Sequence, residues 1–372
     1  MPQDNPPHAS RHVFFMRQAI ALAKKGLGLT SPNPAVGAVV VRSGAVISKG
    51  FHRKAGLPHA ERAAIERIKK INKDSTLYVT LEPCCHYGRT PPCTDLIIGS
   101  GIKRVVIGAV DPNPKVRGKG IRALMGAGVE VTTGVLKEEC GALNEQYEKH
   151  ITTGLPFVTL KLATTLDGKI ATKTGESRWI TGIEARRFAH RLRSVHDAVM
   201  VGCNTVMKDD PELTVRHLRG RNPKRIVLDS TLRTPLEARV FNNIHKDGGD
   251  ELIIFTTSRA KAGDVNRVRE KGATVIIAPA GENGLSLSHV LKELGRLGVT
   301  GVLVEGGATL AAAFLKQGLV DRFMLCVSPM IIGGDGVSAI GALGIDRLKQ
   351  ALRLKDLSIK RLGADILFNG NF

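Results

Sequence analysis

The sequence has 372 residues, of which 42% are hydrophobic and 24% charged, and its formal net charge is +20. This length suffices for two or three domains, and this composition is typical of a folded globular protein. No apolar run approaches the roughly 18 residues that a transmembrane helix needs, so we expect no membrane span. The polar, proline-containing residues 1–11 lack the hydrophobic core of a signal peptide.

Cysteine content and charge distribution narrow the class of protein further. Six cysteines in a chain of this length give no disulfide framework, so we expect a cytoplasmic protein. The positive charge is shared evenly between residues 1–150 and 151–372, and only one tryptophan and three tyrosines accompany it. Without an aromatic platform, this pattern predicts a solvated basic surface that attracts phosphorylated small molecules rather than nucleic acid.

Hydrophobic periodicity in the first part of the chain predicts helices alternating with strands, which is typical of a three-layer α/β domain. We expect helices over 13–26, 60–70, 121–128 and 137–150, with another beginning after Cys93, and strands over 36–42, 45–51, 77–81, 104–109 and 129–134. Small residues and a proline at 152–156 predict a boundary, giving domains 1–150 and 151–372.

One histidine and two cysteines in the first domain have the residue types of a catalytic zinc site. We expect His59, Cys84 and Cys93 to bind the metal and to leave its fourth position open to water. Glu61 follows His59 closely, as a carboxylate that transfers protons would, and His-x-Glu with Pro-Cys is the pattern of zinc-dependent base deaminases. The spacing between the cysteines exceeds the usual Cys-x-x-Cys, so Cys85 and His86 compete as ligands; both are expected to lie outside the metal shell.

The second part of the chain contains short β-rich runs and no Gly-x-Gly-x-x-Gly fingerprint. We expect strands over 157–163, 198–202, 225–229, 252–256, 274–278, 302–305 and 322–327. Gly306 and Gly307 precede a predicted helix, where backbone amides can approach an anion, although a simple tight turn explains the same pattern.

Residues 33–37, 80–84, 86, 88–93 and 111–114 closely resemble the bifunctional riboflavin-biosynthesis deaminase–reductase family, and the resemblance continues through the second part of the chain. It implies an α/β protein with an N-terminal cytidine-deaminase-like three-layer domain, followed by a dihydrofolate-reductase-like domain. It also implies one zinc ion per chain, NADPH in the second domain, a phosphorylated pyrimidine substrate and a homo-oligomer.

The resemblance further implies roles for individual residues. Asn33 and His52 line the deaminase pocket, and Glu61 is catalytic. The residues that meet the dinucleotide are Ala163, Ser177, Trp179, Thr205, Asp209, Ser230, Gly307, Ala308, Thr309, Leu310, Ala311, Ala312 and Ala313. The residues that meet the reductase substrate are Lys161, Arg193, Leu213, Arg216 and Glu305.

The expected function is therefore hydrolytic deamination of a diaminopyrimidinone ribosyl phosphate, followed by reduction of its ribosyl group to ribityl. Two alternatives belong to other classes. A nucleobase deaminase acting on RNA would suit the positive charge but leaves residues 151–372 unexplained. A zinc-stabilised binding module without chemistry would have no use for Glu61, because a closed structural site needs no carboxylate beside its ligands.

Overall fold

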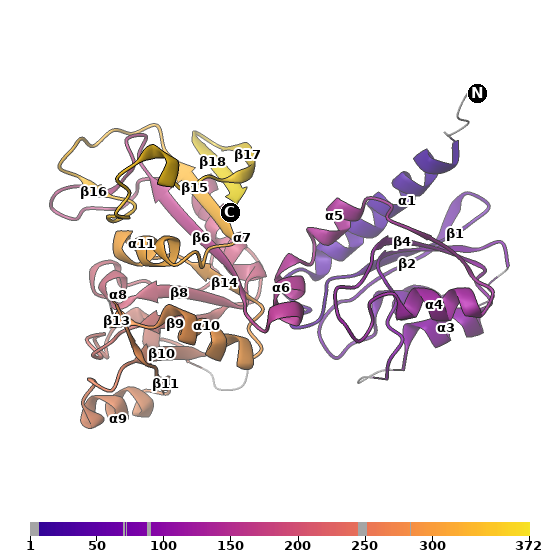
Figure 1. Ribbon diagram of the computed structural model, residues 1–372, viewed down its shortest axis with the longest axis horizontal. Coiled ribbons are helices and arrows are strands. Elements are labelled where there is room, and N and C mark those ends of the chain that lie inside the picture. The colour runs from indigo at the N-terminus through magenta and orange to yellow at the C-terminus, as the bar shows by residue number, and fades with distance from the viewer. Residues whose placement is uncertain (1–6, 70, 72, 88–90, 245–250, 283) are drawn as a thin grey trace. The chain divides into compact units, whose positions relative to one another are not determined.

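The computed structural model describes residues 7–69, 71, 73–87, 91–244, 251–282 and 284–372 (Figure 1). The chain divides into two compact units, residues 1–154 and 155–372, and each is described by itself. Among the described helices, none combines the length and the apolar character needed to cross a bilayer.

The first unit is a five-stranded sheet with helices on both faces, in the order β2-β1-β3-β4-β5. Strand β1 runs antiparallel to β2 and β3, whereas β3, β4 and β5 are parallel. The elements are α1 (Pro7–Ala23), β1 (Gly37–Arg42), β2 (Ala45–Phe51), α2 (Ala60–Ile65), β3 (Thr76–Leu81), α3 (Cys93–Ser100), β4 (Arg104–Ala109), α4 (Lys119–Gly126), β5 (Glu130–Thr133), α5 (Lys137–Gly141) and α6 (Glu145–Thr153).

Two glycines allow helices to lie directly on this sheet, one on each face. A Cβ atom on Gly37 would lie 2.0 Å from the carbonyl oxygen of Ala19 in α1. A Cβ on Gly50 would lie 2.4 Å from the carbonyl oxygen of Ala60 in α2. Because Gly50 pairs with Ala38, the neighbour of Gly37, the two glycines point to opposite faces. The predicted three-layer arrangement is therefore confirmed.

Three predicted helices differ from the structure. The helix expected over 13–26 begins earlier, at Pro7, and ends at Ala23, after which Lys24–Gly26 form a 3-10 turn. The helix expected over 60–70 ends at Ile65, where the chain enters a turn closed by a hydrogen bond from the Ile68 amide to the Ile65 carbonyl; residue 70 lies outside the described residues. The helix expected over 137–150 is divided into α5 and α6. Between them, the buried Asn144 side chain accepts a hydrogen bond from the Ala35 amide at 2.7 Å and donates one to the Ala35 carbonyl at 3.0 Å. These two bonds hold the turn between α5 and α6 against the segment that precedes β1.

The second unit contains a nine-stranded sheet in the order β11-β10-β9-β8-β14-β6-β15-β18-β17. Its elements are β6 (Phe157–Thr164), β7 (Lys169–Ala171), α7 (Ile183–Val195), β8 (Ala198–Gly202), α8 (Cys203–Asp209), β9 (Lys224–Leu228), β10 (Leu252–Thr256), α9 (Ala262–Glu270), β11 (Thr274–Ile277), β12 (Ala280–Gly281), β13 (Gly284–Leu285), α10 (Leu287–Arg296), β14 (Gly301–Val304), α11 (Ala308–Lys316), β15 (Arg322–Val327), β16 (Val337–Ser338), β17 (Lys355–Leu362) and β18 (Asp365–Asn371).

The strands from β11 to β15 in this order are parallel, so their carboxyl ends share one edge of the sheet. Ligands in open α/β sheets bind at that edge. The antiparallel pair β17–β18 was not predicted. All of β17 except Leu362 is solvent-exposed, so the short alternation of Leu357 and Ile359 with polar residues does not correspond to a buried face.

Substituting Gly37 tests the close contact between α1 and the sheet. We expect Gly37→Ala to lower the free energy of unfolding of the first unit by about 1–3 kcal/mol, because the added methyl group overlaps backbone atoms that have no rotamer to change. Gly99→Ala is the matched control, since a Cβ there meets nothing within 4 Å. Hydrogen exchange of β1 and β3 measures the effect, and equal stability of the two variants would contradict this account of the packing.

Candidate active sites

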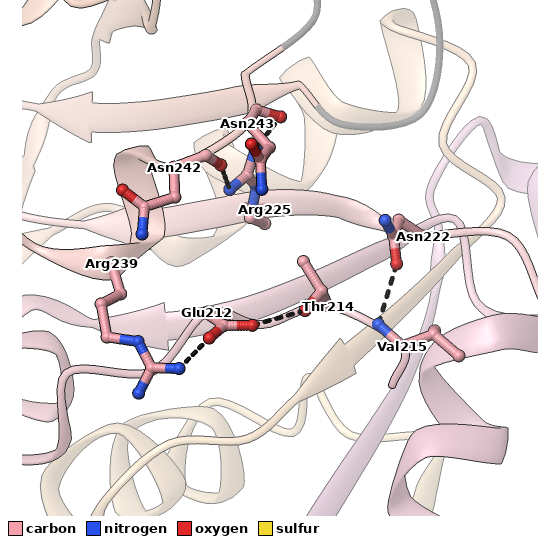
Figure 2. A pocket seen from close by; sticks show the side chains of 8 residues that line it. All are labelled: Glu212, Thr214, Val215, Asn222, Arg225, Arg239, Asn242 and Asn243. Atoms are coloured by element: carbon pink, nitrogen blue, oxygen red, sulfur yellow. Dashed lines mark hydrogen bonds and ion pairs between the residues drawn. The ribbon is translucent and has the colours of Figure 1, made fainter. Parts of the chain in front are cut away.

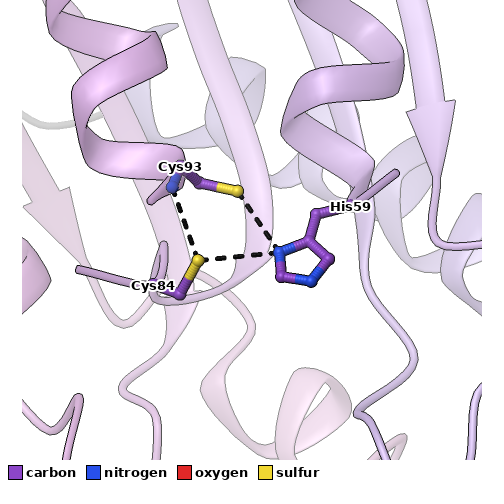
Figure 3. A group of neighbouring side chains, drawn as sticks. All are labelled: His59, Cys84 and Cys93. Carbon is purple, nitrogen blue, oxygen red and sulfur yellow. Dashed lines mark hydrogen bonds between the residues drawn. The ribbon is translucent and has the colours of Figure 1, made fainter. Parts of the chain in front are cut away.

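Three potential metal donors meet at one point in the first unit (Figure 3). His59 immediately precedes α2, Cys84 follows β3, and Cys93 is the first residue of α3. The His59 Nδ1 atom lies 3.6 Å from the Sγ atom of Cys84 and 3.4 Å from that of Cys93. All three donor atoms lie within 4.8 Å of one another.

These separations fit a tetrahedral zinc ion. Zn–S bonds of about 2.3 Å and Zn–N bonds of about 2.0 Å place a nitrogen and a sulfur ligand about 3.5 Å apart. Cys85 and His86 do not belong to the group of donors, and His86 is exposed. Part of the intervening loop, residues 88–90, lies outside the described residues.

The two cysteines share one proton in the metal-free protein. The hydrogen bond from the Cys93 thiol and, to a smaller extent, the hydrogen bond with His59 together lower the pKa of Cys84 to about 4, against the effect of burial. The Cys93 backbone amide also donates to the Cys84 sulfur, at 3.4 Å. The same thiol–thiolate hydrogen bond, together with burial, raises the pKa of Cys93. A thiolate is thus already present, which is the form that binds a metal.

Glu61 lies in the first turn of α2 and is 4% exposed. Burial is the main cause that raises the pKa of its carboxyl group to about 7, and the negative charge of Cys84 adds to it. A group with that pKa is suited to accept and then release a proton near neutral pH.

Asn33 and His52 lie beside the three donors. The Nδ1–H of His52 donates to the Pro58 carbonyl at 3.1 Å, which leaves Nε2 to accept a hydrogen bond from the Asn33 amide nitrogen at 3.3 Å. Burial lowers the pKa of His52, so the ring is neutral. Its ring centroid lies 5.2 Å from that of His59, in an edge-to-face arrangement.

Glu82 is a residue whose role sequence reasoning missed, although its motif was recognised. Its buried carboxylate accepts hydrogen bonds from the amides of Asp111, Gly118 and Ile121, at 3.2, 2.9 and 3.1 Å. It therefore fastens the loop that follows β4 to the segment carrying Cys84. The available signal in the sequence was an acidic residue that directly follows a predicted buried strand and stands two residues before a metal-binding cysteine.

In the second unit, Arg193 of α7 and Glu305, which follows β14, bind each other. The Arg193 Nε and Nη2 atoms lie 3.1 and 2.6 Å from the two Glu305 carboxylate oxygens. Burial alone would raise the pKa of Glu305, but the charge and hydrogen bonds of Arg193 hold it below its usual value. The Arg193 Nη1 atom also donates to the Thr214 carbonyl, at 3.0 Å.

Several residues predicted to contact the dinucleotide lie near one another. The Ser177 hydroxyl donates to the Asp209 carboxylate at 3.3 Å. The Thr205 hydroxyl lies 3.9 Å from where a Cβ on Gly307 would be. Trp179 is 64% exposed, with the Arg186 guanidinium 4.4 Å from its ring centroid, so it does not pack in the core.

Other predicted residues have buried side chains. Leu213 is 1% exposed and packs in a hydrophobic cluster, and Ala311 and Ala312 face the core. Any ligand contact of Leu213 must therefore use its backbone.

Glu212 lines a polar pocket of about 330 Å³ (Figure 2). Arg216 is linked to this pocket through its ion pair with Glu212. The Glu212 carboxylate pairs with Arg216 at 2.6 Å and also with Arg239, and it accepts a hydrogen bond from the Thr214 hydroxyl at 3.2 Å. The Val215 amide donates to Asn222 at 2.8 Å. These contacts fix the backbone of the segment that contains Leu213 and Arg216.

Comparison with known proteins agrees with this division into two sites. Residues 9–109 match the zinc-binding region of cytidine and deoxycytidylate deaminases, and residues 156–368 match the RibD C-terminal domain. The chain is 47% identical to the riboflavin biosynthesis protein RibD of Aquifex aeolicus over 95% of its own length and 96% of the relative's. It is 36% identical to RibD of Escherichia coli, over 95% and 97% of the two chains.

Solved structures give the same result over the whole chain. The structure of Acinetobacter baumannii RibD superposes with a TM-score of 0.88 at 37% identity, covering 98% of this chain and 99% of the other. A diaminohydroxyphosphoribosylaminopyrimidine deaminase/5-amino-6-(5-phosphoribosylamino)uracil reductase from Thermotoga maritima gives 0.86 at 39% identity, with the same coverage. The chain therefore belongs to the RibD family, the bifunctional deaminase–reductases of riboflavin biosynthesis.

Proposed function

We propose that the first unit deaminates 2,5-diamino-6-(5-phosphoribosylamino)pyrimidin-4(3H)-one and that the second reduces the ribosyl group of the product with NADPH. The observation that carries this proposal is the meeting of His59, Cys84 and Cys93 beside the buried Glu61. In the deamination, water adds to the ring carbon that bears the amino group, and ammonia leaves.

The donor set supports one zinc ion per chain, held by His59, Cys84 and Cys93. Zinc in such a site supplies a hydroxide nucleophile at neutral pH. Glu61 is the proton carrier: its carboxylate accepts one proton of the attacking water and passes it to the ring nitrogen. It then accepts the proton of the newly added hydroxyl group and delivers it to the amino group, which leaves as ammonia as the ring carbonyl forms. We assign Asn33 and His52 to the pyrimidine, since their hydrogen-bonded pair lies next to His59.

The segment from Gly307 to the first turn of α11 supports binding of the dinucleotide diphosphate. Gly307 precedes this helix without a side-chain cap, and the Thr205 hydroxyl lies 3.9 Å from where a Cβ on Gly307 would be. Backbone amides at a helix N-terminus favour phosphate groups. We also assign to NADPH the residues Ala163, Ser177, Trp179, Asp209, Ser230, Ala308, Thr309, Leu310, Ala311, Ala312 and Ala313.

NADPH supplies the hydride, and the chain's residues hold the substrate in place for it. We assign Lys161, Glu305 and Arg193 to the sugar end of the substrate. Arg216 is the candidate for its phosphate, because its guanidinium is half-exposed while Glu212 fixes its position. The Leu213 backbone completes the substrate-binding segment.

We also propose that the chain forms a homo-oligomer. Strand β17 is the edge of the nine-stranded sheet, and it exposes Leu357 and Ile359 to 54% and 64%. Exposed apolar side chains on an edge strand favour contact with another chain.

Cysteine substitutions test the metal site. We expect Cys84→Ser and Cys93→Ser to lose bound zinc, because each removes one of three protein ligands, whereas Cys85→Ser retains it. Metal content of purified protein, measured by mass spectrometry, gives the answer. Loss of zinc from Cys85→Ser equal to that from Cys84→Ser would overturn this ligand assignment.

Substitution of Glu61 tests whether the two sites act independently. Glu61→Gln should lower the rate of ammonia release by at least roughly a hundredfold, the usual contribution of a general acid–base group. NADPH oxidation should continue at the wild-type rate when the deaminated intermediate is supplied directly.

Glu66→Gln is the matched control, because Glu66 is an exposed carboxylate at the other end of α2 whose ion-pair partner among the described residues is Arg62. It should retain both activities. A parallel loss of reductase activity in Glu61→Gln, with the fold intact, would favour one shared site instead.

A further inference from the structure

Two side chains on one face of α7 hold the segment 214–216, which carries the arginine that we assign to the substrate phosphate. His190 and Arg193 are three residues apart, so they lie on the same side of the helix. The Arg193 Nη1 atom donates to the Thr214 carbonyl at 3.0 Å. The His190 Nδ1 atom lies 3.3 Å from the backbone nitrogen of Arg216 and 3.1 Å from the Thr214 carbonyl oxygen. The segment is thus bound to the helix at both of its ends.

The His190 Nδ1 atom can serve only one of these two backbone groups at a time, because it either carries a proton or accepts a hydrogen bond. The Thr214 carbonyl already receives a hydrogen bond from Arg193. The tautomer with the ring proton on Nε2 therefore satisfies both backbone groups, since Nδ1 then accepts the Arg216 amide hydrogen. The other tautomer would leave that amide facing a donor.

His190 is neutral, as this contact requires. Its side chain is 5% exposed. Burial and, to a smaller extent, neighbouring positive groups, of which Arg193 has the largest effect, lower the pKa of the ring to about 4. His217 and Arg216 act in the same direction, and Glu305 acts in the opposite one. A protonated ring would carry donors on both nitrogens and could not accept the amide hydrogen.

The backbone next to Arg216 needs such contacts to keep its shape. Leu213 has a φ of 57°, in the left-handed region that costs free energy for a residue other than glycine. The Val215 amide is held from another side by Asn222, at 2.8 Å. The Arg216 amide is held by His190, so this histidine fixes the point from which the Arg216 side chain extends.

We infer that His190 is a positioning residue for the substrate phosphate: it accepts the Arg216 amide hydrogen and thereby restricts where the Arg216 guanidinium can lie. Arg193, on the same helix face, pairs with Glu305, and we assign this pair to the sugar end of the substrate. One helix thus sets the spacing between the groups for the sugar and the group for the phosphate. This inference rests on the proposed role of Arg216 in the reductase.

Two substitutions of His190 test this role. Leucine cannot accept a hydrogen bond, whereas the asparagine side chain has an amide oxygen that can take the place of Nδ1. His190→Leu should raise the Michaelis constant for the deaminated intermediate roughly threefold to tenfold, as expected for one hydrogen bond, with kcat and the Michaelis constant for NADPH unchanged. His190→Asn should stay near the wild type. A purely structural role predicts the opposite order, because asparagine is the poorer helix former.

His196 supplies a matched control for loosening of α7. It is a buried histidine that directly follows this helix, but its ring bonds to the Leu192 carbonyl and the Thr159 hydroxyl, at 2.8 and 2.9 Å, and not to the segment 214–216. His196→Leu should lower the Tm and leave the Michaelis constant for the intermediate unchanged.

Combining His190→Leu with Arg216→Ala shows whether the histidine acts through the arginine. Arg216→Ala alone should raise the Michaelis constant for the intermediate, and His190→Leu should then add little to that rise, because the group that it positions is already absent.

The outcomes separate this inference from the function on which it rests. An unchanged Michaelis constant in His190→Leu, fully additive effects in the double variant, or an equal effect of His196→Leu would overturn the inference and leave the reductase function intact. A normal Michaelis constant in Arg216→Ala would overturn the assignment of Arg216 to the phosphate, and this inference with it. Failure of the wild type to oxidise NADPH with the intermediate would overturn the proposed reductase function itself.

Discussion

Backbone amides at the beginnings of helices are the physical feature on which both sites depend. In the first unit, the amide of Cys93, the first residue of α3, donates to the Cys84 sulfur and so favours the thiolate. In the second, the uncapped start of α11 follows Gly307, in the segment that we assign to the dinucleotide. Each set of amides lies at the carboxyl ends of parallel strands, where the sheet leaves room for a ligand. The two sites differ in their chemistry, but in both of them a parallel sheet positions the backbone amides at the start of a helix.

The two sites depend on different electrostatic effects: burial in the first unit and charge pairing in the second. In the first unit, the charged group beside the metal donors is Glu61, and burial raises the pKa of its carboxyl group to the range needed for proton transfer. The second uses arginines whose charge is balanced by Glu305 and Glu212. A buried pair such as Arg193–Glu305 contributes little net stability. It strongly fixes the orientation of both side chains, because removing either partner leaves the other charge without compensation. Much of the positive charge around this site is therefore structural.

Local sequence patterns predicted those features that depend on residues close together in the chain. The His-Ala-Glu motif and the Pro-Cys motif predicted which side chains meet, because each lies directly beside a regular element. The pairing of Arg193 with Glu305 joins residues 112 positions apart, and no local pattern indicates it. Glu82 was visible in its motif, but its role required the loop after β4 to fold over it. The buried side chain of Leu213 and the exposed strand β17 likewise depend on tertiary packing that outweighs local preference.

The central claim is that one chain carries two successive reactions, deamination and then reduction. Simultaneous recording of ammonia release and NADPH absorbance, with the diaminopyrimidinone substrate and purified protein, tests it most directly. The account predicts that ammonia appears first, that NADPH oxidation follows after a lag, and that the two totals become equal. NADPH oxidation without a lag and without ammonia release would contradict it.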